Sequence, residues 1–177
     1  MKYKLLLPLI GLSSLALLSA CQNLTPPKGV TPVTPFDVQK YQGKWFEVAR
    51  LENRFEKGLT HVTATYHLEN DGTVTVINRG FNPRKDQWSE SIGKARFTGS
   101  QDRAALKVSF FGPFYASYNV IALDKDYQAA LVCGPDRSYL WILSRQPRLT
   151  PAMRQNLLAE ARQAGFEINQ LLWTDQE

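Results

Sequence analysis

The chain has 177 residues, of which 44% are hydrophobic, and its formal net charge is +5 at pH 7. This length allows one domain with a sizeable core. Because the basic residues form no dense cluster, the mild positive charge gives no reason to expect nucleic-acid binding. The two histidines and two cysteines lack metal-ligand spacing, and the sequence contains neither a glycine-rich phosphate loop nor a Ser-His-Asp arrangement. We therefore predict no metal and no cofactor.

The N-terminal segment has the pattern of an export signal. Lys2 and Lys4 precede an apolar run of about 14 residues, which is short for a membrane span but typical of a signal peptide. Leu18-Ser19-Ala20-Cys21 follows and resembles the bacterial lipobox. This resemblance implies a signal peptide over residues 1–20, cleavage before Cys21 and acylation of Cys21. An ordinary secretory signal cut near Ala20, or an uncleaved buried helix, would instead leave Cys21 unmodified.

The residues after Cys21 bear on location and attachment. In lipoproteins an aspartate after the cysteine favours the inner membrane, whereas Gln22 stands here. We therefore expect lipid anchoring in the outer membrane, on its periplasmic side. Prolines at 26, 27, 32 and 35 predict that residues 21–35 form an extended tether, which holds the domain of residues 36–177 off the membrane surface. With Cys21 acylated, Cys133 has no partner for an intramolecular disulfide.

Short segments of alternating apolar and polar residues, separated by turn residues, fill the centre of the chain. Residues 62–68 alternate with a period of two, and Asn70-Asp71-Gly72 is a strong hairpin turn. The pattern predicts strands whose number and spacing suit a sandwich or an up-and-down barrel. The eight predicted strands are residues 45–51, 62–68, 73–79, 88–98, 106–110, 118–122, 129–133 and 139–143.

A helix is predicted after the last of these strands. Thr150 is a suitable N-cap, Pro151 suits the first helical position, and Gly165 can end the helix. One side of the helix is apolar and should pack on the sheet; it consists of Met153, Leu157, Ala161 and Ala164. Residues 166–173 are expected to add a short edge strand.

Three motifs in register on these elements identify a family resemblance. Gly43-Lys44-Trp45 on the first strand matches the Gly-x-Trp opening of the lipocalins, and Arg145 after the eighth strand matches their third motif. Asp126-Tyr127, between the sixth and seventh strands, is similar to the second motif, with Lys125 where threonine is common. Together with the lipobox, these motifs resemble the bacterial lipocalins of the outer membrane, close to the apolipoprotein D branch.

The resemblance implies an all-β fold: an eight-stranded antiparallel up-and-down β-barrel, closed at one end, with one C-terminal helix packed outside. It also implies that the motif residues are structural rather than ligand-binding. A guanidinium above an indole ring makes a cation–π contact, so Trp45 and Arg145 should seal the closed end. The expected structural residues are Gly43, Trp45, Asp126, Tyr127 and Arg145.

An eight-stranded barrel has an interior just wide enough for side chains or for one small ligand. Small residues at 64, 93, 95 and 122 favour leftover space, with a packed interior as the alternative. The apolar register of each strand turns Ala122 and Leu131 inward and gives a set of mainly apolar ligand contacts. These are Ala64, Tyr66, Val76, Asn78, Ala95, Val108, Phe110, Tyr118, Val120, Cys133, Tyr139 and Trp141.

Strand parity places the loops after the first, third, fifth and seventh strands at the open mouth. These loops carry basic residues that would bind the phosphate or carboxylate of a ligand, or else are simply solvated: Arg54, Lys57, Arg84, Lys85 and Arg137. They also carry aromatic residues, which fit a second copy of the chain in a homodimer, the bilayer, or a lid over the ligand. The aromatic set is Phe55, Phe81, Phe111, Phe114 and Tyr115.

A carrier or store of fatty acids or lysophospholipids, tethered to the membrane and without enzyme activity, is the function that these features favour. Two alternatives stay open. Cys133, if it faces the cavity as a thiolate, would be the nucleophile of a barrel enzyme, although neither His61 nor His67 is an obvious base for it. An empty barrel would instead indicate a structural protein of the cell envelope.

Overall fold

The computed structural model describes residues 23–176, so the predicted signal peptide and Cys21 lie outside the described residues. Among residues 23–176, no helix has both the length and the apolar content needed to cross a membrane.

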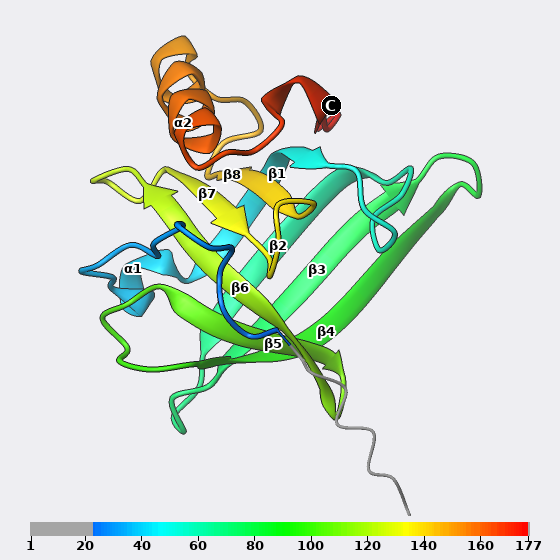
Figure 1. The fold of residues 1–177 in the computed structure, drawn as a ribbon. Helices are drawn as coiled ribbons and strands as arrows, with labels where there is room; N and C mark the ends of the chain where they lie inside the picture. Colours follow the sequence, from blue (N-terminus) through cyan, green and yellow to red (C-terminus); the bar gives the residue numbers. More distant parts are fainter. Residues whose placement is uncertain (1–22, 177) are drawn as a thin grey trace, which may run out of the picture.

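The predicted barrel is confirmed (Figure 1). Each strand pairs antiparallel with the next, and β1 pairs with both β8 and β2, which closes the sheet on itself. In Figure 1 the open end faces right, where the β3–β4 and β5–β6 hairpins end. The strands are β1 Gly43–Leu51, β2 Thr60–Leu68, β3 Val74–Asn82, β4 Gln87–Phe97, β5 Ala105–Phe111, β6 Phe114–Leu123, β7 Ala129–Cys133 and β8 Leu140–Ser144.

The predicted C-terminal helix is also present as α2 (Pro151–Gln163). The Thr150 side chain accepts a hydrogen bond from the backbone N–H of Met153, and Gly165 ends the helix with φ of +84°. Leu157 and Ala161 are buried in a cluster between α2 and the outer face of β1, β7 and β8. A 3-10 turn, Ile168–Gln170, then leads to the expected edge strand β9 (Leu171–Trp173), which pairs with β1.

The closed end is sealed as the first and third motifs predicted. A short helix, α1 (Val38–Tyr41), precedes β1, and Trp45 is fully buried and donates from Nε1 to the Tyr41 carbonyl at 2.8 Å. The Arg145 guanidinium lies 3.9 Å from the centroid of the Trp45 ring. Gly43 has φ of +89°, a conformation that favours glycine, and a Cβ there would lie 3.4 Å from Nη1 of Arg145.

Of the two residues of the second motif, Tyr127 makes contacts at the closed end, whereas Asp126 is exposed. The Tyr127 hydroxyl accepts from the backbone N–H of Asp37 at 2.9 Å, and the Tyr127 carbonyl accepts from Nε of Arg145 at 3.2 Å. The β6–β7 turn is capped by the carboxylate of Asp124, which accepts from the backbone N–H groups of Asp126 and Ala129.

The segment from Asn23 to Phe36 is not the free tether that its prolines suggested. Val30, Pro32 and Phe36 are buried against the barrel. The backbone N–H of Val33 donates to the carbonyl of Val120 on β6 at 2.9 Å. The prediction was wrong because a proline-rich segment is equally able to lie flat on a surface when apolar residues between its prolines find a partner.

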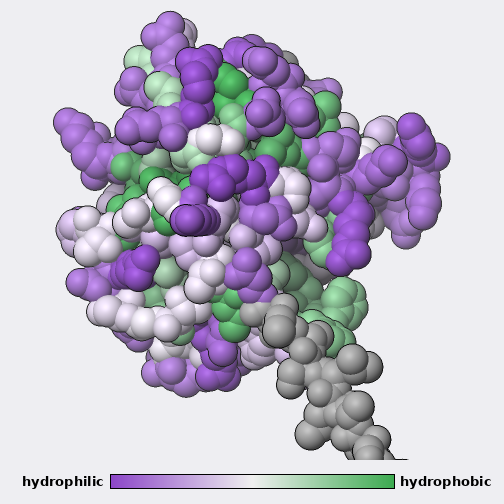
Figure 2. All heavy atoms as spheres, viewed as in Figure 1, coloured by the Kyte–Doolittle hydropathy of each residue, from purple (hydrophilic) through white to green (hydrophobic). Residues whose placement is uncertain are grey.

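The outer surface is mixed. Figure 2 shows hydrophilic residues over most of the visible face, with hydrophobic atoms near α2 and at the lower right, beside the tip of the β5–β6 hairpin.

Candidate functional site

Most of the predicted contact residues face the barrel interior. Residues directly opposite on paired strands share a face of the sheet, so Asn78, the partner of Ala64, also faces inward and is half-buried. Tyr139 stacks on Trp141, with 6.1 Å between ring centroids. The interior cluster contains Ala64, Tyr66, Val76, Ala95 and Val120 as buried members, with Val108, Phe110, Tyr118 and Trp141 packed against them.

The half of the barrel near the closed end is filled. The Tyr118 hydroxyl lies 2.8 Å from both the Tyr41 and the Tyr66 hydroxyls, so these three polar groups satisfy one another. Burial raises the pKa of all three, which keeps them protonated. An apolar cavity of about 20 Å³ remains between Phe36, Tyr66 and their neighbours, room for about one water molecule. No acyl chain fits this half in the present arrangement.

The half near the mouth is open. Val108, Phe110 and Trp141 are only half-buried although they face inward. Ser91, the partner of Asn78, and Ala116, the partner of Val108, also face inward and are exposed. The inner wall of this half is therefore accessible to a ligand from solvent.

The barrel wall is also open on one side, between β4 and β5, because these two strands pair over only part of their length. Of the described residues of β4, Lys94–Phe97 pair with β5, whereas all of residues 87–95 pair with β3. The β3–β4 and β5–β6 hairpins consequently diverge toward the mouth (Figure 1). Gly93 leaves no empty space there, because a Cβ would lie 2.8 Å from the ring of Phe110, which occupies that position.

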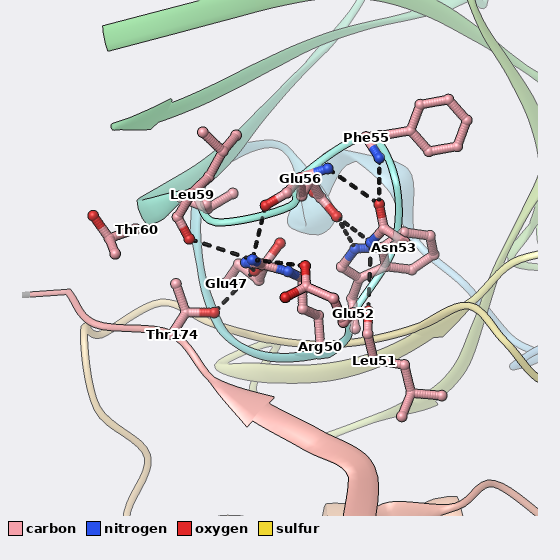
Figure 3. Close-up of polar contacts among 12 residues, drawn as sticks. Glu47, Arg50, Leu51, Glu52, Asn53, Phe55, Glu56, Leu59, Thr60 and Thr174 are labelled. Carbon is pink, nitrogen blue, oxygen red and sulfur yellow. Dashed lines mark hydrogen bonds and ion pairs between the residues drawn. The ribbon is translucent and has the colours of Figure 1, made fainter. Parts of the chain in front are cut away.

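A buried charged cluster lies at the inner edge of the mouth (Figure 3). Arg50 on β1 is fully buried and donates from Nη1 to Oε1 of Glu47 at 2.7 Å. Its Nη2 donates to the carbonyls of Glu56 at 2.8 Å and Leu59 at 3.3 Å, and it lies 3.5 Å from the Glu52 carboxylate. Arg50 therefore fastens the β1–β2 loop, residues 52–59, to the barrel wall.

The same loop turns a second carboxylate inward. Oε2 of Glu56 accepts from Nδ2 of Asn53 at 2.6 Å and from Nε1 of Trp141 at 2.8 Å. Because Trp141 faces the interior, Glu56 lies over the cavity rather than in bulk solvent. The loop thus covers part of the mouth.

Glu47 is the most perturbed acid of this cluster. Burial, followed by the nearby charge of Glu56, raises its pKa to about 8, although Arg50 acts in the opposite direction. The Thr174 hydroxyl also donates to Oε1 of Glu47 at 2.9 Å. Nε2 of Gln176 bridges the carbonyls of Glu47 and Val62 at 2.7 and 2.8 Å, which joins β1 to β2 where the two strands do not pair.

The sequence missed this cluster and predicted a basic rim in its place. Arg54 and Lys57 are exposed on the β1–β2 loop, and Arg84 and Lys85 are exposed on the β3–β4 turn. The innermost ionisable side chains, however, are two glutamates around one arginine. Strict alternation from inward-facing Trp45 would place Glu47 inward, as observed. It would place Arg50 outward, but a β-bulge between Glu47 and Ala49 turns Arg50 inward.

Arg137 does not line the cavity, which corrects its predicted role. Its Nε donates to the carbonyl of Ala164 at the end of α2, and its Nη2 donates to the carbonyl of Lys28, both at 2.9 Å. Arg137 therefore joins the β7–β8 loop to α2 and to the N-terminal segment outside the barrel.

The prediction that Cys133 faces the cavity was also wrong. Cys133 is fully buried in the cluster between the barrel and α2, together with Leu131 and, at its edge, Ala122. Ala130 and Val132 take the inward positions of β7. Both faces of this strand are apolar, so alternation did not distinguish them, and a bulge between Val120 and Ala122 shifts the register of β6.

Cys133 is expected to be unreactive. Burial raises the pKa of its thiol to about 12, so the thiolate is scarce at neutral pH. In a Cys21→Ser protein, where Cys133 is the sole thiol, we expect a disulfide reagent to label the folded protein at least about 100-fold more slowly than the denatured protein. Equal labelling rates would show that this wall of the barrel opens.

Comparisons with known proteins agree with this geometry. Residues 36–176 match the model of the lipocalin-like domain. The chain is 56% identical over 172 residues to the outer membrane lipoprotein Blc of Citrobacter freundii, covering 97% of each chain. It is 31% identical to mouse apolipoprotein D, covering 80% of this chain and 77% of the relative. Among solved structures, the Per a 4 allergen from cockroaches superposes with a TM-score of 0.68 at 21% identity, over 86% of this chain and 96% of the allergen. The chain belongs to the lipocalin family.

Proposed function

We propose that this chain is an outer-membrane lipoprotein, anchored through acylated Cys21 on the periplasmic side, that binds fatty acids or lysophospholipids in the half of its barrel near the mouth. The anchor is supported by the lipobox sequence and by the name of the Citrobacter freundii relative, an outer membrane lipoprotein. The binding role is supported by one observation above all: an inward-facing apolar wall that is accessible to solvent at one end.

This wall suits a single acyl chain. Val108, Phe110 and Trp141 supply apolar area, and Asn78 and Ser91 supply polar groups beside it. Burying each methylene contributes about 0.8 kcal/mol. A chain of roughly 16 carbons would bind with micromolar affinity even when only part of it is buried and the ordering costs are subtracted.

The polar end of the ligand would lie at the mouth. Arg54, Lys57, Arg84 and Lys85 are exposed there and are long enough to follow a phosphate or carboxylate as it moves. The carboxylate of Glu56 accepts from the side-chain donors of Asn53 and Trp141. An incoming acidic group would compete with Glu56 for these donors.

Ligand extraction tests the proposal. Organic extracts of the purified protein, analysed by mass spectrometry, should contain single-chain lipids, and these lipids should displace a fluorescent fatty acid. Recovery of no lipid, together with no binding of the fluorescent fatty acid, would leave the barrel as a structural envelope protein. Catalysis through Cys133 receives no support, because the side chain of this β7 residue faces α2 rather than the barrel interior.

Two neighbouring positions on β4 give a matched pair of variants. Ser91 faces the interior, whereas Ile92 is the partner of Ile77 on the outer face and is 61% exposed. Ser91→Trp should fill the accessible half and weaken fatty-acid binding about tenfold or more, a change of about 1.4 kcal/mol. Ile92→Trp should leave the affinity unchanged. Equal effects in a displacement titration would place the ligand elsewhere.

A further inference from the structure

The N-terminal segment runs along the outside of the barrel from its open end to its closed end. At the open end, Nδ2 of Asn23 donates to the carbonyl of Pro135 in the β7–β8 loop at 3.4 Å. At the closed end, the backbone N–H of Phe36 donates to the carbonyl of Asp102 in the β4–β5 turn at 2.7 Å. The segment therefore has a fixed direction relative to the barrel.

Hydrogen bonds between these ends also hold the segment in place, among them that of the Val33 N–H to the Val120 carbonyl. Arg137 donates to the carbonyl of Lys28, and the carbonyl of Val33 accepts from the backbone N–H of Ala104 at 2.9 Å. Buried Pro32 adds apolar contact. Because the segment is attached along its length, it cannot act as a long spacer.

The direction of this segment determines where the anchor would lie. Cys21 is two residues before Asn23, and two residues of chain span at most about 7 Å. The acyl chains on Cys21 would therefore be held within a short distance of the β7–β8 loop, at the open end of the barrel.

Exposed aromatic residues occupy the same end. Phe55 on the β1–β2 loop is 66% exposed, and Phe111 and Phe114 at the tip of the β5–β6 hairpin are 79% and 64% exposed. Phe111 and Phe114 are directly paired, so their rings lie on one face of the hairpin. Figure 2 shows hydrophobic atoms at this end. Among the described residues, no large exposed hydrophobic side chain lies in the turns at the closed end.

We infer that the barrel rests on the bilayer with its mouth toward the lipid, with Phe55, Phe111 and Phe114 in the interfacial layer beside the acyl chains of Cys21. This inference rests on the proposed function, from which it takes the acylation of Cys21. Single exposed aromatics bind a bilayer weakly, but an anchor at the same end holds them at high effective concentration beside it. Arg54, whose guanidinium lies 4.8 Å from the Phe55 ring, is placed to contact lipid phosphates.

The orientation has a consequence for ligand exchange. A single-chain lipid would move between the leaflet and the barrel through the mouth, without crossing water. The exposed inner wall of β4 and β6 would then face the acyl region rather than the periplasm.

Depth measurements on the full acylated chain test the orientation. Gly112 at the β5–β6 tip and Gly99 in the β4–β5 turn lie at opposite ends, and a Cβ at either position meets no atom within 4 Å. Gly112→Cys and Gly99→Cys would each carry a fluorophore, while buried Cys133 stays unlabelled. Both proteins would be reconstituted in phosphatidylethanolamine–phosphatidylglycerol vesicles that contain lipids with nitroxide near the head group.

We expect quenching of the Gly112→Cys label to be at least fivefold stronger than quenching of the Gly99→Cys label. Equal quenching, stronger quenching at Gly99, or no quenching at either position would overturn the inference. A protein that binds fatty acid in solution yet gives one of these results would retain its binding function and lose the proposed orientation. A protein that shows the expected quenching and binds no lipid would retain the proposed orientation and lose the proposed binding function.

The aromatic residues can be tested in the same vesicles. Replacing Phe55, Phe111 and Phe114 together by serine should slow transfer of a fluorescent fatty acid from the vesicle to the protein at least fivefold. Ile92→Ser removes a comparably exposed apolar residue from the outer face of β4 and should not slow transfer. Equal transfer rates in the two variants would contradict a role for these rings at the membrane.

Discussion

Replacing Arg145 by alanine is expected to lower the free energy of unfolding by about 4 kcal/mol. The Arg145 guanidinium donates to four backbone carbonyls, at distances of 2.8 to 3.2 Å, and lies over the Trp45 ring. Its removal leaves these carbonyls without their donor and uncovers the indole at the closed end. The measurement is the urea midpoint, interpreted at constant m-value.

Two control variants separate this contact from a general effect of charge. Lysine at 145 keeps the charge but lacks the planar set of donors, so Arg145→Lys should recover less than half of the lost stability. Lys125→Ala, at an exposed position in the β6–β7 turn, should change stability by no more than about 0.5 kcal/mol. Similar losses for Arg145→Ala and Lys125→Ala would contradict the account of the closed end.

The second large effect expected is a loss of stability as the pH rises. Burial raises the pKa of Glu47 from 4.5 to about 8, so between these values the folded protein binds more protons than the unfolded chain. The free energy of unfolding should therefore fall as the pH increases from about 4.5 to about 8. At about 1.4 kcal/mol for each pKa unit, we expect a fall of about 5 kcal/mol over this range. The opposing effect of Arg50 is already contained in the pKa of about 8.

Glu47→Gln isolates this contribution. Glutamine still accepts hydrogen bonds from Arg50 and Thr174 but does not ionise. The unfolding free energy of the Glu47→Gln protein should therefore change little over the same pH range, and at pH 9 it should exceed that of the wild type. Glu52→Gln, which alters a half-exposed carboxylate 3.5 Å from Arg50, should keep the pH dependence. Parallel pH profiles for wild type and Glu47→Gln in urea titrations would show that Glu47 is ionised throughout.

Patterns with a local physical cause were predictable from the sequence. Alternation located all eight strands, and Thr150, Pro151 and Gly165 located α2 because capping depends on a few adjacent residues. The lipocalin motifs predicted the contact between Trp45 and Arg145.

Features that depend on strand register or on tertiary contact were not predictable. The bulge between Glu47 and Ala49 turns Arg50 inward, and the residues around this bulge form no pattern that predicts a bulge. Cys133 lies on a strand that is apolar on both faces, so the sequence pattern does not indicate which face points inward. The outward face is buried because α2 packs on it. Glu56 reaches the cavity only because its loop folds back onto Arg50 and Trp141.

The prolines of the N-terminal segment are a third case of this kind. They indicate extended backbone but do not distinguish a free tether from a segment packed on the barrel. The distinction depends on Val30, Val33 and Phe36 finding apolar partners, which are supplied by parts of the chain distant in sequence.

The most direct test of lipid binding uses Trp141, whose ring faces the accessible half of the interior. A fatty acid brominated midway along its chain quenches indole fluorescence on contact. Titration of the purified protein should give saturable quenching with a midpoint in the micromolar range, and Trp141→Phe should lose more than half of it, since Trp88 and Trp173 are exposed on the outer surface. Quenching that does not saturate, or that is the same with phenylalanine at position 141, would contradict binding inside the barrel.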